Sequence, residues 1–111
     1  MQIDWKYEGF EDLEAIGFTS EYIRLDHDSQ IIKPAFTAEY LLNSGFYPRG
    51  TTVIYLGKHG YDFQRENIEK VGIKEGDVLT VLSCSVGSSS STYTFEEIKG
   101  SHNTVLFEKT T

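Results

Sequence analysis

The sequence VLTVLSC at residues 78–84 is the clearest strand signal in this chain and decides its fold class. Its run of β-branched and apolar residues is typical of a strand, because such side chains fit a pleated, half-buried surface. The turn EGD at residues 75–77 precedes it, and the stretch GSSSS at residues 87–91 follows it. Because TYTF at residues 92–95 resumes the strand pattern, we expect the serine-rich stretch to be a hairpin loop.

Two further strand signals lie outside this hairpin, TTVIYL at residues 51–56 and TVLFE at residues 104–108. The longest excursion, residues 57–76, follows the first of them and has room for about two helical turns at residues 64–71. A long first loop followed by a compact meander is typical of a small SH3-like barrel, whose closure protects short strands from edge pairing. We therefore predict such a barrel over about residues 51–109.

The N-terminal half, residues 1–50, is less regular. Apolar side chains at helical spacing predict a short amphipathic helix at residues 11–16, and we expect a strand at residues 22–25. A second helix is expected at residues 38–42, where a threonine precedes the helical run as N-cap. Because no linker separates the halves, we predict one α+β domain, mainly β, over residues 1–111, with the N-terminal α/β extension packed on the barrel.

The charge of the chain restricts its partners. Net charge is −7, from 17 acidic and 10 basic side chains, and most of the excess lies in residues 1–30. Direct nucleic-acid binding is disfavoured, because phosphate contacts require clustered Lys and Arg. The pattern favours a protein partner with a basic surface, since opposite fields steer encounter. The alternative is that the acidic side chains only keep the protein soluble.

The sequence contains no recognisable catalytic or cofactor motif, and we expect no cofactor. The one cysteine, Cys84, ends an apolar strand and is expected to be structural. The segment DHD at residues 26–28 lacks the glycine and terminal acid of a calcium loop, so we expect a solvated turn and no metal. With no leader and no apolar run of about 20 residues, we expect a cytoplasmic protein without membrane contact.

Aromatic residues gather in the predicted loops and at their edges. Tyr47, Tyr61 and Phe63 precede or occupy the long excursion, and Tyr93 follows the serine-rich loop. In SH3-like barrels such rings bind extended peptides or flat surfaces, and tyrosine suits an interface because one end is apolar and the other hydrogen-bonds. The alternative is that these rings fill the core. The expected partner-binding residues, aromatic and acidic, are Glu11, Asp12, Glu14, Asp26, Asp28, Tyr47, Tyr61, Phe63 and Tyr93.

The C-terminal segment also resembles a family. GDVLTV at residues 76–81, TYTFEEI around Tyr93 and NTVLFE at residues 103–108 are similar to the strands of short phage and prophage proteins. The resemblance covers about the last 35 residues and implies a small SH3-like barrel that acts in a bacterial host, where the compartment would be the host cytoplasm. It brings no catalytic residues with it.

Three functions remain after these exclusions. The leading hypothesis is a non-enzymatic interaction protein, phage-encoded, that inhibits a host defence protein through its acidic surface. The alternative is a module that binds a nucleotide or small molecule in an aromatic cleft near Tyr61, Phe63 and Tyr93. A small hydrolase is least favoured, because it would need a histidine beside Cys84 or a carboxylate in one cleft.

Neutralising the acidic surface tests the leading hypothesis. Replacing the five acids by their amides is expected to weaken partner binding and flatten its dependence on salt, because screening acts only on the charges that remain. Affinity measured at two ionic strengths checks this, and an unchanged affinity would contradict the role of Glu11, Asp12, Glu14, Asp26 and Asp28.

Overall fold

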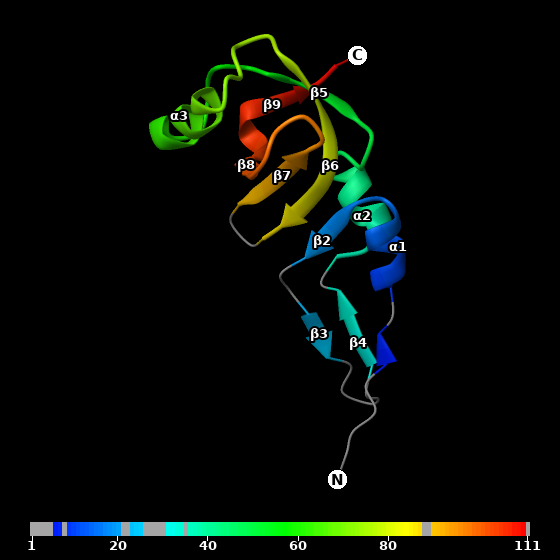
Figure 1. Ribbon diagram of the computed structural model, residues 1–111. Coiled ribbons are helices and arrows are strands. Elements are labelled where there is room, and N and C mark those ends of the chain that lie inside the picture. Colours follow the sequence, from blue (N-terminus) through cyan, green and yellow to red (C-terminus); the bar gives the residue numbers. More distant parts are fainter. Residues whose placement is uncertain are drawn as a thin grey trace.

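The computed structural model describes residues 6–7, 9–20, 23–25, 31–34, 36–87 and 90–110 (Figure 1). Its elements, in chain order, are β1 (Lys6–Tyr7), α1 (Phe10–Ala15), β2 (Phe18–Ser20), β3 (Ile23–Leu25), β4 (Ile31–Pro34), α2 (Ala38–Asn43), β5 (Thr52–Tyr55), α3 (Asp62–Lys70), β6 (Val78–Val86), β7 (Ser91–Phe95), β8 (Ser101–Asn103), the 3-10 helix η1 (Thr104–Leu106) and β9 (Phe107–Lys109). The predicted α+β class, mainly β, is confirmed.

Strand β6 is the centre of the structure. Its register with β7 shifts at Leu82, where a bulge adds one residue to the strand. The bulge moves the buried positions from odd to even numbers, so that Leu79 and Val81 before it and Cys84 and Val86 after it are all buried. One long strand thereby supplies apolar side chains to the core along its whole length.

Three strands pair with β6 directly. Strand β7 is antiparallel to it along one edge. The other edge is divided, because β5 pairs antiparallel with residues 78–80 and β2 pairs parallel with residues 84–86. The bulge lies between these two partners. Strand β6 therefore joins the N-terminal segment to the C-terminal meander.

The main sheet has the strand order β8-β7-β6-β5-β9, with β2 added beside β6. Strands β5, β6 and β7 and the long excursion after β5 follow the predicted meander. The last predicted strand, residues 104–108, differs, because residues 104–106 form η1 and only residues 107–108 belong to β9. However, β8 and β9 lie at opposite ends of the order and do not pair among the described residues, so the sheet is open. A closed SH3-like barrel over residues 51–109 is therefore not confirmed. The two end strands have three residues each and only η1 between them, which leaves few backbone groups for a closing ladder.

Side-chain packing joins the two halves of the curled sheet where backbone pairing does not. The ring of Phe107 on β9 lies 4.8 Å from that of Phe95 and 6.1 Å from that of Tyr93, both on β7, and 5.9 Å from that of Tyr55 on β5, measured between centroids. All four rings are buried and meet at tilted or edge-on angles, the geometry that aromatic quadrupoles favour. Each such contact contributes about 0.5–1.5 kcal/mol beyond burial.

The helices begin where capping groups place them. Tyr40 N donates to Thr37 Oγ1 over 3.1 Å, so α2 starts at the predicted N-cap. Helix α1 matches the helix predicted at residues 11–16 and buries Leu13. Helix α3 starts two residues before the predicted 64–71, because Gln64 Oε1 accepts a 2.8 Å hydrogen bond from the backbone N–H of Tyr61.

The N-terminal segment is attached to β6 through a tight backbone junction. Cys84 N donates to Gly17 O over 2.7 Å, and Arg49 N donates to Ile16 O over 2.8 Å. The Arg49 side chain also donates from Nε to Leu82 O over 3.1 Å, so it fills the space beside the bulge. A separate three-stranded sheet, in the order β1-β4-β3, lies beyond β2 and away from the main sheet (Figure 1).

Gly17 is required at this junction for two reasons. Its φ is +80°, and a Cβ there would lie 2.9 Å from the carbonyl oxygen of Leu82. Gly45 is a matched control, because its φ is +90° but nothing lies within 4 Å of an added Cβ. We expect Gly45→Ala to cost about 1–2 kcal/mol for the left-handed backbone alone, and Gly17→Ala to cost at least about 1 kcal/mol more through the clash.

Urea denaturation of the two variants measures the difference. Equal losses of unfolding free energy in the two variants would show that the junction can move aside and that β2 is only loosely packed on β6.

Candidate functional site

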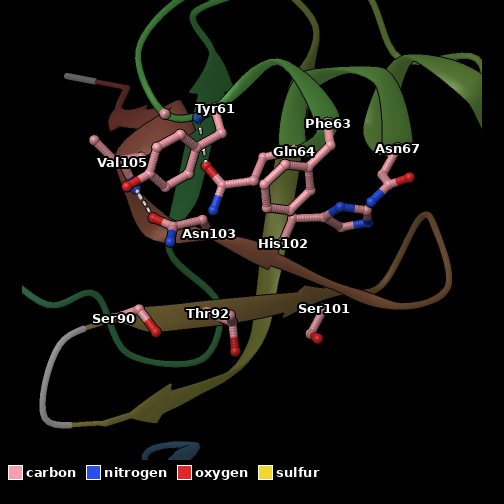
Figure 2. Close-up of a pocket in the computed structure, with 11 residues that line it drawn as sticks. Tyr61, Phe63, Gln64, Asn67, Ser90, Thr92, Ser101, His102, Asn103 and Val105 are labelled. Carbon is pink, nitrogen blue, oxygen red and sulfur yellow. Dashed lines mark hydrogen bonds between the residues drawn. The ribbon is translucent and has the colours of Figure 1, made fainter.

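A pocket of about 790 Å³ lies between the start of α3 and the strands β7 and β8 (Figure 2). It is lined by Gly60, Tyr61, Phe63, Gln64, Asn67, Ser90, Thr92, Ser101, His102, Asn103 and Val105. Figure 2 shows the aromatic rings and amides of the helix on one side and three hydroxyl side chains on the other. Its volume falls within the usual range for ligand pockets, about 300–1,000 Å³.

A rigid turn positions the aromatic side of the pocket. His59 and Gly60 both have positive φ, at 70° and 64°. The Arg65 guanidinium donates to the carbonyl oxygens of both residues and forms an ion pair with Asp62. A Cβ at Gly60 would lie 3.0 Å from Leu106 Cδ2, so the turn also packs closely against η1. These contacts fix the direction in which α3 leaves the turn.

Tyr61 and Phe63 form a stacked pair at the mouth of the pocket. Their ring centroids are 5.8 Å apart and their planes differ by 8°. Tyr61 is 70% exposed and Phe63 is 60% exposed. Because the two exposed rings lie side by side next to a pocket, we treat them as a candidate interaction surface.

The opposite side of the pocket is polar and uncharged. Thr92 on β7 pairs in register with Asn103 on β8, and Thr94 pairs with Ser101. Because neighbouring residues of a strand point to opposite faces, these side chains occupy the outer face of the sheet. Asn103 Oδ1 accepts a 2.9 Å hydrogen bond from Val105 N, which fixes both the amide and the start of η1.

His102 forms the inner end of the pocket. It is 8% exposed, its ring stacks on Phe95 with centroids 6.3 Å apart, and its Nε2 lies 3.4 Å from Lys99 O. Burial lowers the pKa of His102, although the hydrogen bond to Lys99 acts in the opposite direction. The imidazole is therefore neutral at pH 7, and no residue that lines the pocket carries a charge.

The other candidates for reactive chemistry are kept apart. Cys84 is fully buried, and burial raises the pKa of its thiol to about 12, so no thiolate forms at neutral pH. In the sheet, Cys84 pairs with Tyr93 and Tyr93 pairs with His102, which places a tyrosine between the thiol and the imidazole. Within the described parts of the chain, no three His, Cys, Asp or Glu side chains converge on a point where a metal ion would fit.

The structure separates the aromatic residues that the sequence grouped together. Tyr61 and Phe63 share the pocket, whereas Tyr93 is only 2% exposed and belongs to the core. Tyr47 is half-buried and stacks on Tyr93 with centroids 6.3 Å apart. Tyr93 therefore fills the core, as the alternative expected, because alternation along β7 turns its side chain inward. The cleft expected near Tyr61, Phe63 and Tyr93 is formed by the first two only.

The acidic residues divide in a similar way. Glu11, Asp12 and Glu14 are exposed on α1, whereas Asp26 and Asp28 lie outside the described residues. Glu11, Asp12 and Glu14 are not among the residues that line the pocket.

Sequence reasoning missed the polar side of the pocket. Asn67, Ser101 and Asn103 belong to no motif, and they come together only because β8 folds back beside α3. The available signal was the alternation in SHN at residues 101–103, with polar side chains on both sides of His102.

Comparisons with known proteins match the part of the chain that contains the pocket. The family model described as Bacteriophage T4 protein Y07B matches residues 51–111. No curated protein and no solved structure shows a significant match. In the described part of the chain, no helix combines the length and the apolar character needed to cross a membrane.

The buried imidazole predicts how stability depends on pH. Because folding lowers the pKa of His102, the unfolded chain binds a proton more readily, so stability falls as pH drops below about 6.5, the ordinary pKa of histidine. We expect the loss of unfolding free energy between about pH 6.5 and pH 5.5 to be smaller in His102→Gln than in the wild type.

Urea denaturation at several pH values measures this effect. The control is His59→Asn, which removes an exposed histidine and leaves the imidazole of His102 in place. Identical pH profiles for wild type and His102→Gln would contradict the assignment.

Proposed function

We propose that this chain, which belongs to the family of bacteriophage T4 protein Y07B, is a non-enzymatic protein that binds another protein through the pocket between α3 and β8. The observation that carries the proposal is the stacked pair Tyr61–Phe63, more than half exposed at the mouth of that pocket.

The exposure of the rings favours a macromolecular partner. A small ligand is usually enclosed by its site, with about 70–90% of its surface buried. Here both rings lie largely in solvent, so a partner with an extensive surface of its own would cover them more completely than a small ligand. Aromatic side chains of this kind are frequent binding hot spots.

The family match supports the same place on the molecule. All residues that line the pocket lie within the matched residues 51–111, whereas α1 lies outside them. We therefore assign the primary contact to the pocket. The exposed acids of α1, Glu11, Asp12 and Glu14, would provide a second contact and favour a partner with a basic region nearby.

Membership of a phage family suggests where this binding protein acts. A phage-encoded protein is made inside a bacterium, so we propose that the partner is a host protein in the bacterial cytoplasm and that occupying its surface inhibits it, as an inhibitor of host defence would. We also propose that the curled sheet has the fold of an SH3-like barrel. The strand order and the long excursion after β5 support this proposal.

A second candidate function is supported by the size of the pocket. At about 790 Å³ it would hold a small ligand, and the ring of Phe63 would stack on a planar group. The lining contains no cation to bind phosphate, so a nucleoside fits better than a nucleotide. A thermal-shift screen with nucleosides tests this, because a ligand that binds only the folded state raises stability.

Removing the two rings tests the proposed function. The tagged full chain is used to capture proteins from a lysate of the bacterial host, beside a Tyr61→Ser/Phe63→Ser variant. We expect the variant to bind the captured protein at least about tenfold more weakly, because hot-spot aromatics contribute about 2 kcal/mol or more.

Tyr40 supplies a matched control. It is 54% exposed on α2 and stacks on Phe36 with centroids 5.3 Å apart, so it resembles the pair in exposure and packing but lies elsewhere. Tyr40→Ser should leave capture unchanged. Equal capture by all three proteins would refute the pocket as the binding site.

A further inference from the structure

We propose that the partner presents an extended, uncharged polypeptide segment to this pocket, and that the segment adds as a strand to the free edge of β8. This inference rests on the proposed function and specifies what part of the partner the pocket receives. Three independent features of the pocket support it.

The first feature is the edge of β8. This strand ends the sheet, and β7 is its only strand partner within the described residues. All three of its residues, Ser101, His102 and Asn103, line the pocket. An edge strand presents unpaired N–H and C=O groups at the spacing of another chain, and strand addition is a common way to bind an extended peptide.

The second feature is the length of the site. A smaller pocket, of about 380 Å³, adjoins the first and shares Ser90, Asn103 and Val105 with it. It continues toward Phe46 and Thr104. The combined site therefore extends from the residues of α3 and β8 past the end of β8, and it suits an extended chain that rises about 3.3 Å per residue.

The third feature is the chemistry of the lining. The chain has a net charge of −7, yet every residue of both pockets is uncharged. A charged segment would be desolvated here without a counter-charge, which is costly. Asn67 and Asn103 have carboxamides, which offer a donor and an acceptor and so match the polar groups of a peptide unit.

The aromatic pair completes the arrangement. In an added strand, alternate side chains point to opposite sides. Those facing α3 would meet Tyr61 and Phe63, and those facing the other way would meet the hydroxyls of Thr92 and Ser101. The site therefore selects apolar side chains alternating with small polar ones.

A displayed library of random peptides of about ten residues supplies the probe, with the full chain and the Tyr61→Ser/Phe63→Ser variant as separate targets. We expect uncharged peptides with alternating apolar and polar residues to be selected on the full chain and on Tyr40→Ser. The selected peptides should bind the double variant at least about tenfold more weakly.

Amide hydrogen exchange then locates the bound peptide. If it adds to β8, the amides of residues 101–103 that exchange fastest in the free protein should slow by at least about tenfold at saturation. Methylation of alternate peptide nitrogens should abolish binding in one register and spare it in the other, because only every second N–H faces β8.

Two outcomes would overturn the inference. One is a set of peptides that protects α3 but no amide of residues 101–103, and the other is the selection of charged or non-alternating sequences. Each is compatible with capture of a host protein that depends on Tyr61 and Phe63. Failure of the inference is thereby distinguished from failure of the proposed function, which the lysate experiment tests alone.

Discussion

The structure depends on the way two strands share one edge of β6. Strand β5 occupies the first part of that edge and β2 the last, and the bulge at Leu82 separates them. The gap is filled by the backbone of Gly17 and by Arg49, whose hydrogen bonds to Ile16 O and Leu82 O connect the residue that precedes Gly17 to the bulge of β6. Because the bulge also keeps the buried side chains of β6 on one face, a single local irregularity sets the register of the meander and the attachment of the N-terminal segment.

The neutral pocket follows from the same sheet. The inner face of β7 and β8 is occupied by Tyr93, Phe95 and His102, so their outer face carries only small polar side chains. Helix α3 lies at the end of the sheet, where β8 has no further strand partner among the described residues. The acids of α1 lie on another element. The uncharged lining of the pocket and the exposed acids of α1 thus belong to different parts of the molecule.

Local sequence patterns predicted most elements but not how their side chains are used. Runs of β-branched and apolar residues identified β5, β6 and β7, and Thr37 identified the start of α2, because both signals act over a few residues. The strand predicted at residues 104–108 forms η1 over its first three residues, and only its end belongs to β9. Tyr61 and Tyr93 looked alike at this level. Their difference arises from tertiary structure, since one stands at a helix start and the other faces inward on a central strand. The polar lining of the pocket escaped prediction for the same reason. The open sheet did so too, because closure of a sheet depends on pairing between residues that are distant in sequence.

The inert thiol of Cys84 gives the molecule a built-in reporter. It is the sole sulfhydryl of the chain, it lies at the junction of β2, β6 and β7, and a raised pKa keeps it protonated. A maleimide or disulfide reagent can modify it only after the central strand has opened. The rate of labelling in native buffer would therefore measure how often the middle of the sheet opens, without any engineered probe.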